Sequence, residues 1–88
     1  MKTAFKRTFL KDVEALGDAA TRQRVREVIT QVESAAKLEE TQGIKKLRGA
    51  DRCYRIRIGD YRLGLLIEEG TIVFVRCLHR RDIYRYFP

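Results

Sequence analysis

The stretch CYRIRIGDYRL (residues 53–63) alternates apolar side chains with arginines, pauses at Gly59-Asp60, and then resumes the same pattern. Alternation with a period of two predicts a β-strand whose arginines point to one face and whose apolar residues point to the other. Gly59-Asp60 is typical of a two-residue hairpin turn, which would place Arg57 directly opposite Arg62. Because like charges facing each other destabilise a sheet, this pairing suggests that a bound anion neutralises them.

The period of two continues after this hairpin. Three strands are expected, at residues 53–58, 61–67 and 71–78. The segment EEG (residues 68–70) predicts a three-residue loop, whose register pairs Ile67 with Thr71 and Arg62 with Arg76. A two-residue turn would instead send Arg76 into the core, where an unpaired guanidinium is costly. The expected core face comprises Leu63, Leu65, Ile67, Val73, Val75 and Cys77, and the opposite face collects Arg57, Arg62 and Arg76, with Arg55 beside Gly64.

The N-terminal half shows a helical period instead. Thr8 is the expected N-cap of a helix over residues 9–16, and Asp18 is the expected N-cap of a second helix that reaches about Leu38. Apolar residues at helical spacing on the second helix form a stripe suited to cover a sheet: Val25, Val28, Ile29, Val32 and Ala36. Residues 2–7 can form a short edge strand.

These patterns predict an α+β fold in a single domain over residues 1–88. Two N-terminal helices pack on one face of a small antiparallel sheet of three to four strands, and a short helical turn ends the chain. No apolar run is long enough to cross a bilayer and no signal-peptide core is present, so a cytoplasmic protein with no membrane partner is expected. Cys53 and Cys77 have no metal-type spacing and are expected to be buried free thiols.

Positive charge is concentrated in the C-terminal half. Residues 44–88 hold eleven lysine and arginine residues against five acidic ones, whereas residues 1–43 hold eight against seven. Nine of the eleven are arginines, whose planar guanidinium matches phosphate oxygens. Most acidic residues of this half fall at loops or turns, so the arginine face is expected to lack local carboxylates. A bound nucleic-acid backbone is the favoured interpretation, and a solvated basic surface is the alternative.

The C-terminal segment HRRDIYRYFP (residues 79–88) contains the single histidine, three arginines and two tyrosines. Cleavage of RNA without a metal needs a base for the 2′-hydroxyl, cations around the developing phosphorane and a proton for the 5′-oxygen. The arginines suit the second need, and His79 and Tyr84 are candidates for the proton transfers. The alternative for His79 is a structural role, and the alternatives for Tyr84 and Tyr86 are anchoring of the tail or stacking on bases. No residues are spaced for Mg²⁺ or Zn²⁺, so no metal and no cofactor is expected.

Three segments together resemble the RelE/ParE superfamily of bacterial and archaeal toxins, and RelE-type mRNA interferases in particular. They are AFKRTFLKDVEAL (residues 4–16), KKLRGADRCYRIRIGDYRLGLLI (residues 45–67) and VFVRCLHRRDIYRYF (residues 73–87). The resemblance implies a toxin of a type II toxin–antitoxin system that inhibits translation by cutting mRNA in the ribosomal A site without a metal. It also implies contacts with ribosomal RNA and a cognate antitoxin that wraps the toxin. A ParE-like DNA gyrase poison and a non-catalytic RNA- or ribosome-binding module are the alternatives.

The resemblance also assigns residues. The paired basic positions of the family fall on Arg55 and Arg57, where many members carry lysine, and a guanidinium is a poorer proton carrier than an amine. The expected catalytic residues are Arg57, Arg62, His79, Arg80 and Tyr84, with Arg81 the neighbouring alternative to Arg80. The expected nucleic-acid-binding residues are Lys45, Lys46, Arg48, Arg55, Arg76 and Arg81.

Overall fold

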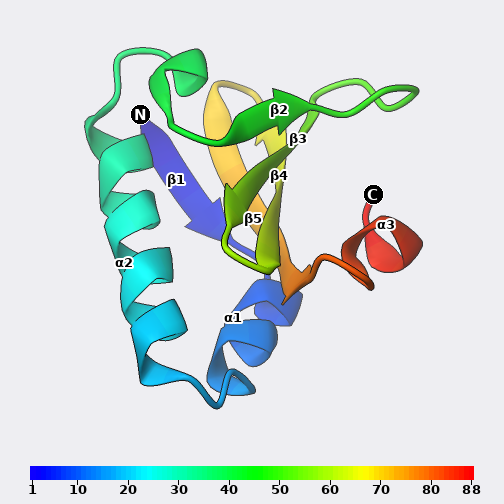
Figure 1. Ribbon diagram of the computed structural model, residues 1–88. Coiled ribbons are helices and arrows are strands. Elements are labelled where there is room, and N and C mark those ends of the chain that lie inside the picture. Colours follow the sequence, from blue (N-terminus) through cyan, green and yellow to red (C-terminus); the bar gives the residue numbers. More distant parts are fainter.

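The computed structural model describes residues 1–88 and has an α+β architecture in which one mixed sheet separates α2 from α3 (Figure 1). The elements are β1 (Lys2–Phe5), α1 (Arg7–Glu14), α2 (Ala19–Ser34), the short 3₁₀ helix η1 (Leu38–Glu40), β2 (Ile44–Lys46), β3 (Cys53–Ile58), β4 (Tyr61–Glu68), β5 (Thr71–His79) and α3 (Ile83–Tyr86). The sheet order is β1-β5-β4-β3-β2. The α+β prediction is confirmed, although the sheet has five strands and β1 runs parallel to β5.

Helix α1 begins directly after the last backbone hydrogen bond between the N-terminal segment and β5. Lys6 donates its backbone N–H to Phe74 O at 2.9 Å, and the chain then turns into the helix at Arg7. The prediction that Thr8 is the N-cap is therefore wrong, because Thr8 already lies in the first turn. Its hydroxyl instead donates to Val75 O at 2.7 Å.

Helix α2 begins as predicted and ends early. The Asp18 carboxylate accepts from Ala20 N at 3.1 Å and from the Thr21 hydroxyl, which caps the helix and lowers the pKa of Asp18. The predicted continuation to Leu38 is wrong, because α2 ends at Ser34. The Glu40 carboxylate accepts from the backbone N–H groups of residues 36 and 37 at 3.1 and 3.2 Å, which turns the chain away from the helix axis.

The second hairpin differs from the prediction. Glu68 pairs with Thr71, so the turn has two central residues rather than three. The register then shifts between Gly64 and Leu65, since Gly64 pairs with Arg76 and Leu65 pairs with Phe74. A β-bulge at residue 75 therefore returns Arg76 to the arginine face despite the shorter turn. The predicted pairing of Arg62 with Arg76 is wrong, because Arg62 pairs with Leu78.

The sheet is buried on both faces. The core beneath the N-terminal helices includes Phe9, Val25, Val32, Ile56, Ile58, Leu63, Leu65, Ile72, Phe74 and Cys77. A smaller cluster on the other face contains Cys53, Ile83 and Phe87, with Leu66, Val75 and Leu78 packed against it. Val75 was predicted on the helix-covered face, but it lies on the opposite one because the two-residue turn shifts the register of β5 by one residue before the bulge. None of the helices combines the length and hydrophobicity needed to span a bilayer.

Candidate active site

The β3–β4 turn gathers most of the predicted catalytic residues. Arg57 lies directly opposite Arg62, as predicted, and Tyr61 lies opposite His79 on β5. Arg80 follows at once, and its backbone N–H donates to Asp60 O at 2.7 Å. Two hairpin strands and the end of a third thus bring these residues to one end of the sheet, with Arg57 and Arg62 on one face and Tyr61 and His79 on the other.

The Arg57–Arg62 pair has no neutralising carboxylate. The two ion pairs of the structure join Arg76 to Asp12 and Arg80 to Asp60. Arg62 is oriented by backbone oxygens instead, since its Nη1 donates to Gly59 O at 2.7 Å and to Tyr61 O at 2.9 Å. Carbonyl groups fix a guanidinium without cancelling its charge, so the pair stays available to an anion.

Arg80 is linked only weakly to the turn by charge. Its Nε lies 3.9 Å from Asp60 Oδ1, and the two side chains are 63% and 73% exposed. An ion pair this exposed contributes little and can exchange Asp60 for another anion. Arg81 is exposed and has no ion-pair partner. The structure therefore attaches Arg80 to the turn that carries Arg57 and Arg62, and gives Arg81 no such link.

His79 packs edge-on against Tyr61, with ring centroids 5.6 Å apart and an interplanar angle of 74°. Its Nδ1 accepts a hydrogen bond from the Arg81 backbone N–H at 3.1 Å. A neutral imidazole has one N–H and one acceptor nitrogen, so this bond puts the proton on Nε2. His79 therefore presents a donor rather than a free lone pair to its surroundings.

A second row of basic residues crosses the sheet beside the first. Lys45 pairs with Arg55, Arg55 with Gly64, and Gly64 with Arg76, and directly paired residues point to the same face. Arg55 donates from Nη1 to Gly43 O at 2.8 Å, whereas its Nε is buried and has no hydrogen-bond partner. That Nε is a donor that a bound anion could satisfy.

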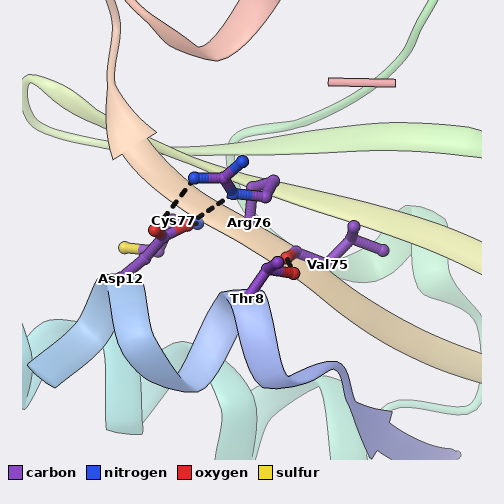
Figure 2. A network of polar contacts seen from close by, with 5 residues as sticks. All are labelled: Thr8, Asp12, Val75, Arg76 and Cys77. Carbon is purple, nitrogen blue, oxygen red and sulfur yellow. Dashed lines mark hydrogen bonds and ion pairs between the residues drawn. The ribbon is translucent and has the colours of Figure 1, made fainter. Parts of the chain in front are cut away.

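Arg76 is paired within the protein, contrary to the expectation that the arginine face lacks carboxylates. Asp12 of α1 accepts from Arg76 Nε at 2.8 Å and from Nη2 at 3.0 Å, in a two-pronged arrangement that raises the pKa of Arg76 (Figure 2). Asp12 also accepts from Cys77 N at 2.9 Å. The sequence signal for this role was the spacing of Thr8 and Asp12, which places both on one side of α1.

The C-terminal segment is anchored by residues that were not predicted to matter. Ile83 and Phe87 are buried, whereas Tyr84 and Tyr86 are 59% and 54% exposed. A Cβ at Gly64 would lie 2.7 Å from the Phe87 ring, so this ring lies against the Gly64 backbone between Arg55 and Arg76. Tyr84 thus projects from α3 and has no hydrogen bond or ring contact to the Arg57–Arg62 pair.

The remaining predicted RNA-binding residues lie along β2 and the loop after it. Lys45, Lys46 and Arg48 are all exposed. Strand β2 starts beside Arg57 and runs away from the β3–β4 turn (Figure 1). Lys45 pairs with Arg55 and extends the basic surface along the sheet, whereas Lys46 pairs with Tyr54 and lies on the other face. No group of three or more His, Cys, Asp or Glu side chains is arranged to hold a metal ion.

Comparison with known proteins agrees with this geometry. Residues 4–84 match the family described as the ParE toxin of the type II toxin–antitoxin system, parDE. The chain is 39% identical over 89 residues to Toxin RelE3 of Methanocaldococcus jannaschii, with both chains covered completely.

Solved structures agree as well. A chain of the RelB–RelE antitoxin–toxin complex from Methanococcus jannaschii superposes on this protein with a TM-score of 0.83. The two chains are 38% identical, and the match covers 97% of this chain and 99% of that one. The archaeal RelE–RelB complex from Pyrococcus horikoshii OT3 has a TM-score of 0.74 over 93% of this chain and 97% of that one, and at 22% identity it supports the fold alone. The chain therefore belongs to the ParE toxin family of type II toxin–antitoxin systems, and within the RelE/ParE superfamily it is a RelE-type toxin.

Proposed function

We propose that this toxin is a metal-independent endoribonuclease that cleaves mRNA in the ribosomal A site. The observation that carries the proposal is the Arg57–Arg62 pair, two facing cations without a carboxylate, with Arg80 held beside them by the turn. A phosphate of RNA supplies the missing negative charge, and the phosphorane formed during cleavage carries more charge than the starting phosphodiester. The arginines therefore stabilise the transition state more than the bound substrate.

In the proposed reaction the ribose 2′-oxygen attacks its adjacent phosphorus and the bond from phosphorus to the 5′-oxygen breaks. The products are a 2′,3′-cyclic phosphate and a 5′-hydroxyl, so one proton leaves the 2′-hydroxyl and one reaches the 5′-oxygen. His79 is the candidate donor to the 5′-oxygen in its imidazolium form, in which Nδ1 is protonated and gives up the hydrogen bond that it accepts from Arg81 N. The exposed Tyr84 is the candidate for the second proton transfer, which requires a movement of α3 or of the RNA toward it.

The test uses programmed ribosomes incubated with the toxin, with mRNA 5′ ends mapped by primer extension. We expect cuts at a fixed position within the A-site codon. Arg62→Ala should lower the single-turnover cleavage rate by about 10²–10³-fold, the usual effect of removing one donor to a developing oxyanion. Arg26→Ala, an exposed arginine on α2, is the matched control and should cut at the normal rate.

Three outcomes would contradict the proposal. An Arg62→Ala toxin with full activity would remove the role of the arginine pair. Intact mRNA together with blocked supercoiling of DNA by gyrase would favour the ParE-like alternative, which the name of the matching family keeps under consideration. Binding to ribosomes without any cleavage would favour the non-catalytic alternative.

An antitoxin is the proposed protein partner, as in the RelB–RelE complexes that this chain resembles. A surface that suits such a partner is an apolar groove of about 680 Å³ between β1, α1 and α2. Phe5 and Leu10 are exposed there, and the charged residues of the groove are Arg7, Lys11, Arg26 and Glu14. An antitoxin segment with apolar side chains and flanking acidic residues would complement both features.

The groove is tested with the antitoxin encoded next to this gene. Leu10→Asp should weaken binding of that antitoxin while leaving mRNA cleavage unchanged, because Leu10 lies away from the arginine pair. Unchanged affinity of the antitoxin would place its contact surface elsewhere.

The cytoplasm is the proposed location of this protein, because a toxin that acts on translating ribosomes has to work there.

A further inference from the structure

A second hollow of about 690 Å³ lies between α2 and the β3–β4 turn, and none of the roles above uses it. Its wall on the helix side carries Arg24, and its wall on the sheet side carries Arg57 and Gly59. Its volume lies within the range of small-ligand sites in proteins. Because Arg57 belongs both to this hollow and to the pair with Arg62, the hollow adjoins the proposed cleavage site.

The charge of the hollow favours an anion. Arg24 of α2 and Arg57 of β3 both belong to its lining, and neither takes part in an ion pair. A Cβ at Gly59 would lie 3.0 Å from Arg24 Nη1, so the Arg24 guanidinium lies against the backbone of the turn. Glu27 is the one acidic side chain in the lining. The turn that pairs Arg57 with Arg62 is thus also contacted by a third unpaired arginine from α2.

The remaining lining residues suit a nucleobase. Val28 is half-buried and provides apolar surface, and Gln31 and Gln42 provide amide groups that can both donate and accept hydrogen bonds. A guanidinium plane such as that of Arg24 can stack on a base as well as attract a phosphate. Gly43 completes the wall with φ +81° and no side chain, and an added Cβ would lie 3.1 Å from Arg57 O.

We propose that this hollow binds one nucleotide of the RNA next to the cleaved linkage, with Arg24 stacking on the base or contacting its phosphate. The inference rests on the proposed ribonuclease function and assigns Arg24 a role in holding the substrate. The RNA backbone would pass from the Arg57–Arg62 pair into the hollow. Arg24 then contributes to affinity, whereas Arg62 contributes to the rate of cleavage.

The test measures fluorescence anisotropy of a labelled single-stranded RNA hexamer with 2′-fluoro sugars, which lacks the attacking hydroxyl and stays intact. Arg24→Ala should weaken binding about tenfold, the size expected for one lost stacking or phosphate contact. Arg26→Ala is the matched control, because it removes the same charge from the same helix outside the hollow. Glu27→Gln should strengthen binding, since it removes the only negative charge in the lining.

Two further measurements separate this inference from the proposed function. If a phosphate contact is lost, the slope of log affinity against log salt should fall by about 0.7, the value for single strands. In single-turnover cleavage on ribosomes, Arg24→Ala should raise the toxin concentration for the half-maximal rate and leave the saturating rate unchanged.

Each outcome decides one of the two ideas. An equal loss of affinity in Arg24→Ala and Arg26→Ala would show a general charge effect and overturn the nucleotide site. The proposed function would still stand in that case if Arg62→Ala were inactive in cleavage. No binding of the hexamer by the unmodified protein, even at low salt, would also overturn the site. Normal cleavage by Arg62→Ala would overturn the proposed function, whatever the result for Arg24.

Discussion

The contact between Asp12 and β5 makes a quantitative prediction about stability. Asp12 accepts three hydrogen bonds, two from Arg76 and one from the Cys77 backbone N–H (Figure 2). These bonds occur where β1 has ended and α1 takes its place along the outer edge of β5. The Thr8 hydroxyl makes a similar bond to Val75 O one helical turn earlier. Side chains of α1 thus replace the missing sheet partner.

The cost of Asp12→Ala has two parts. An unsatisfied, largely buried N–H at Cys77 costs about 1–3 kcal/mol. The lost pair with Arg76 costs about 1–2 kcal/mol, between the values for exposed and buried pairs, because the side chains of Arg76 and Asp12 are 24% and 12% exposed. The sum is about 3 kcal/mol. For a chain of this size it corresponds to a fall in Tm of roughly 12–24 °C.

The assay is urea and thermal unfolding, with Glu14→Ala, an exposed position on the same helix, as the control. Asp12→Asn should lose about half as much, because the amide oxygen can accept one bond but carries no charge. In an Arg76→Met background, Asp12→Ala should cost only the part assigned to Cys77 N–H. A loss below about 0.5 kcal/mol for Asp12→Ala would refute the reasoning, because surface changes without such contacts have effects of that size.

Three further predictions concern other parts of the fold. Gly64→Ala should destabilise the protein by about 1–3 kcal/mol and expose the C-terminal segment to proteolysis, because its Cβ would lie 2.7 Å from the Phe87 ring; a double variant with Phe87→Leu should recover stability, and an intact segment in the single variant would contradict the packing. Burial and then the Asp12 charge raise the pKa of Cys77 to about 12, so its thiol should react with Ellman's reagent at neutral pH only on unfolding, and fast labelling of the folded protein would disprove this. The pKa of Asp18 is lowered in the fold, so the charged cap stabilises the protein fully when the pH is above 3.8, and this stabilisation is lost as the pH falls below that value. The difference in stability between the unmodified protein and Asp18→Ala should therefore shrink in acid, and a difference that stays constant would rule out the cap.

The local elements of the C-terminal half could be predicted because each depends on neighbouring residues. Alternation in β3 and the Gly59-Asp60 turn correctly gave the pairing of Arg57 with Arg62. The Asp18 cap was also predictable, since the carboxylate bonds an N–H two residues along the chain. The end of α2 was not, because the Glu40 side chain that stops it comes from beyond the helix.

The candidate site was predicted in part for the same reason. His79 was assigned from its place at a strand end and Arg80 from the family resemblance, and the register of β5 with β4 brings both to the turn. The carboxylate on Arg76 was missed because Asp12 is 64 residues away in the chain. The anchors of the tail were missed as well, since burial of Ile83 and Phe87 depends on the second face of the sheet.

The sequence by itself determined the α+β class, the arginine face and the pairing of Arg57 with Arg62, because period and turn chemistry are local properties. Only the tertiary structure decided which arginines stay free. The β-bulge keeps Arg76 on the arginine face even though the turn is shorter than predicted, and α1 then supplies Asp12 to neutralise it. Arg57 and Arg62 have no ion-pair partner. The acidic side chain at their turn is that of Asp60, and it forms its ion pair with Arg80. Which arginines stay unpaired is thus set by contacts between segments far apart in the chain.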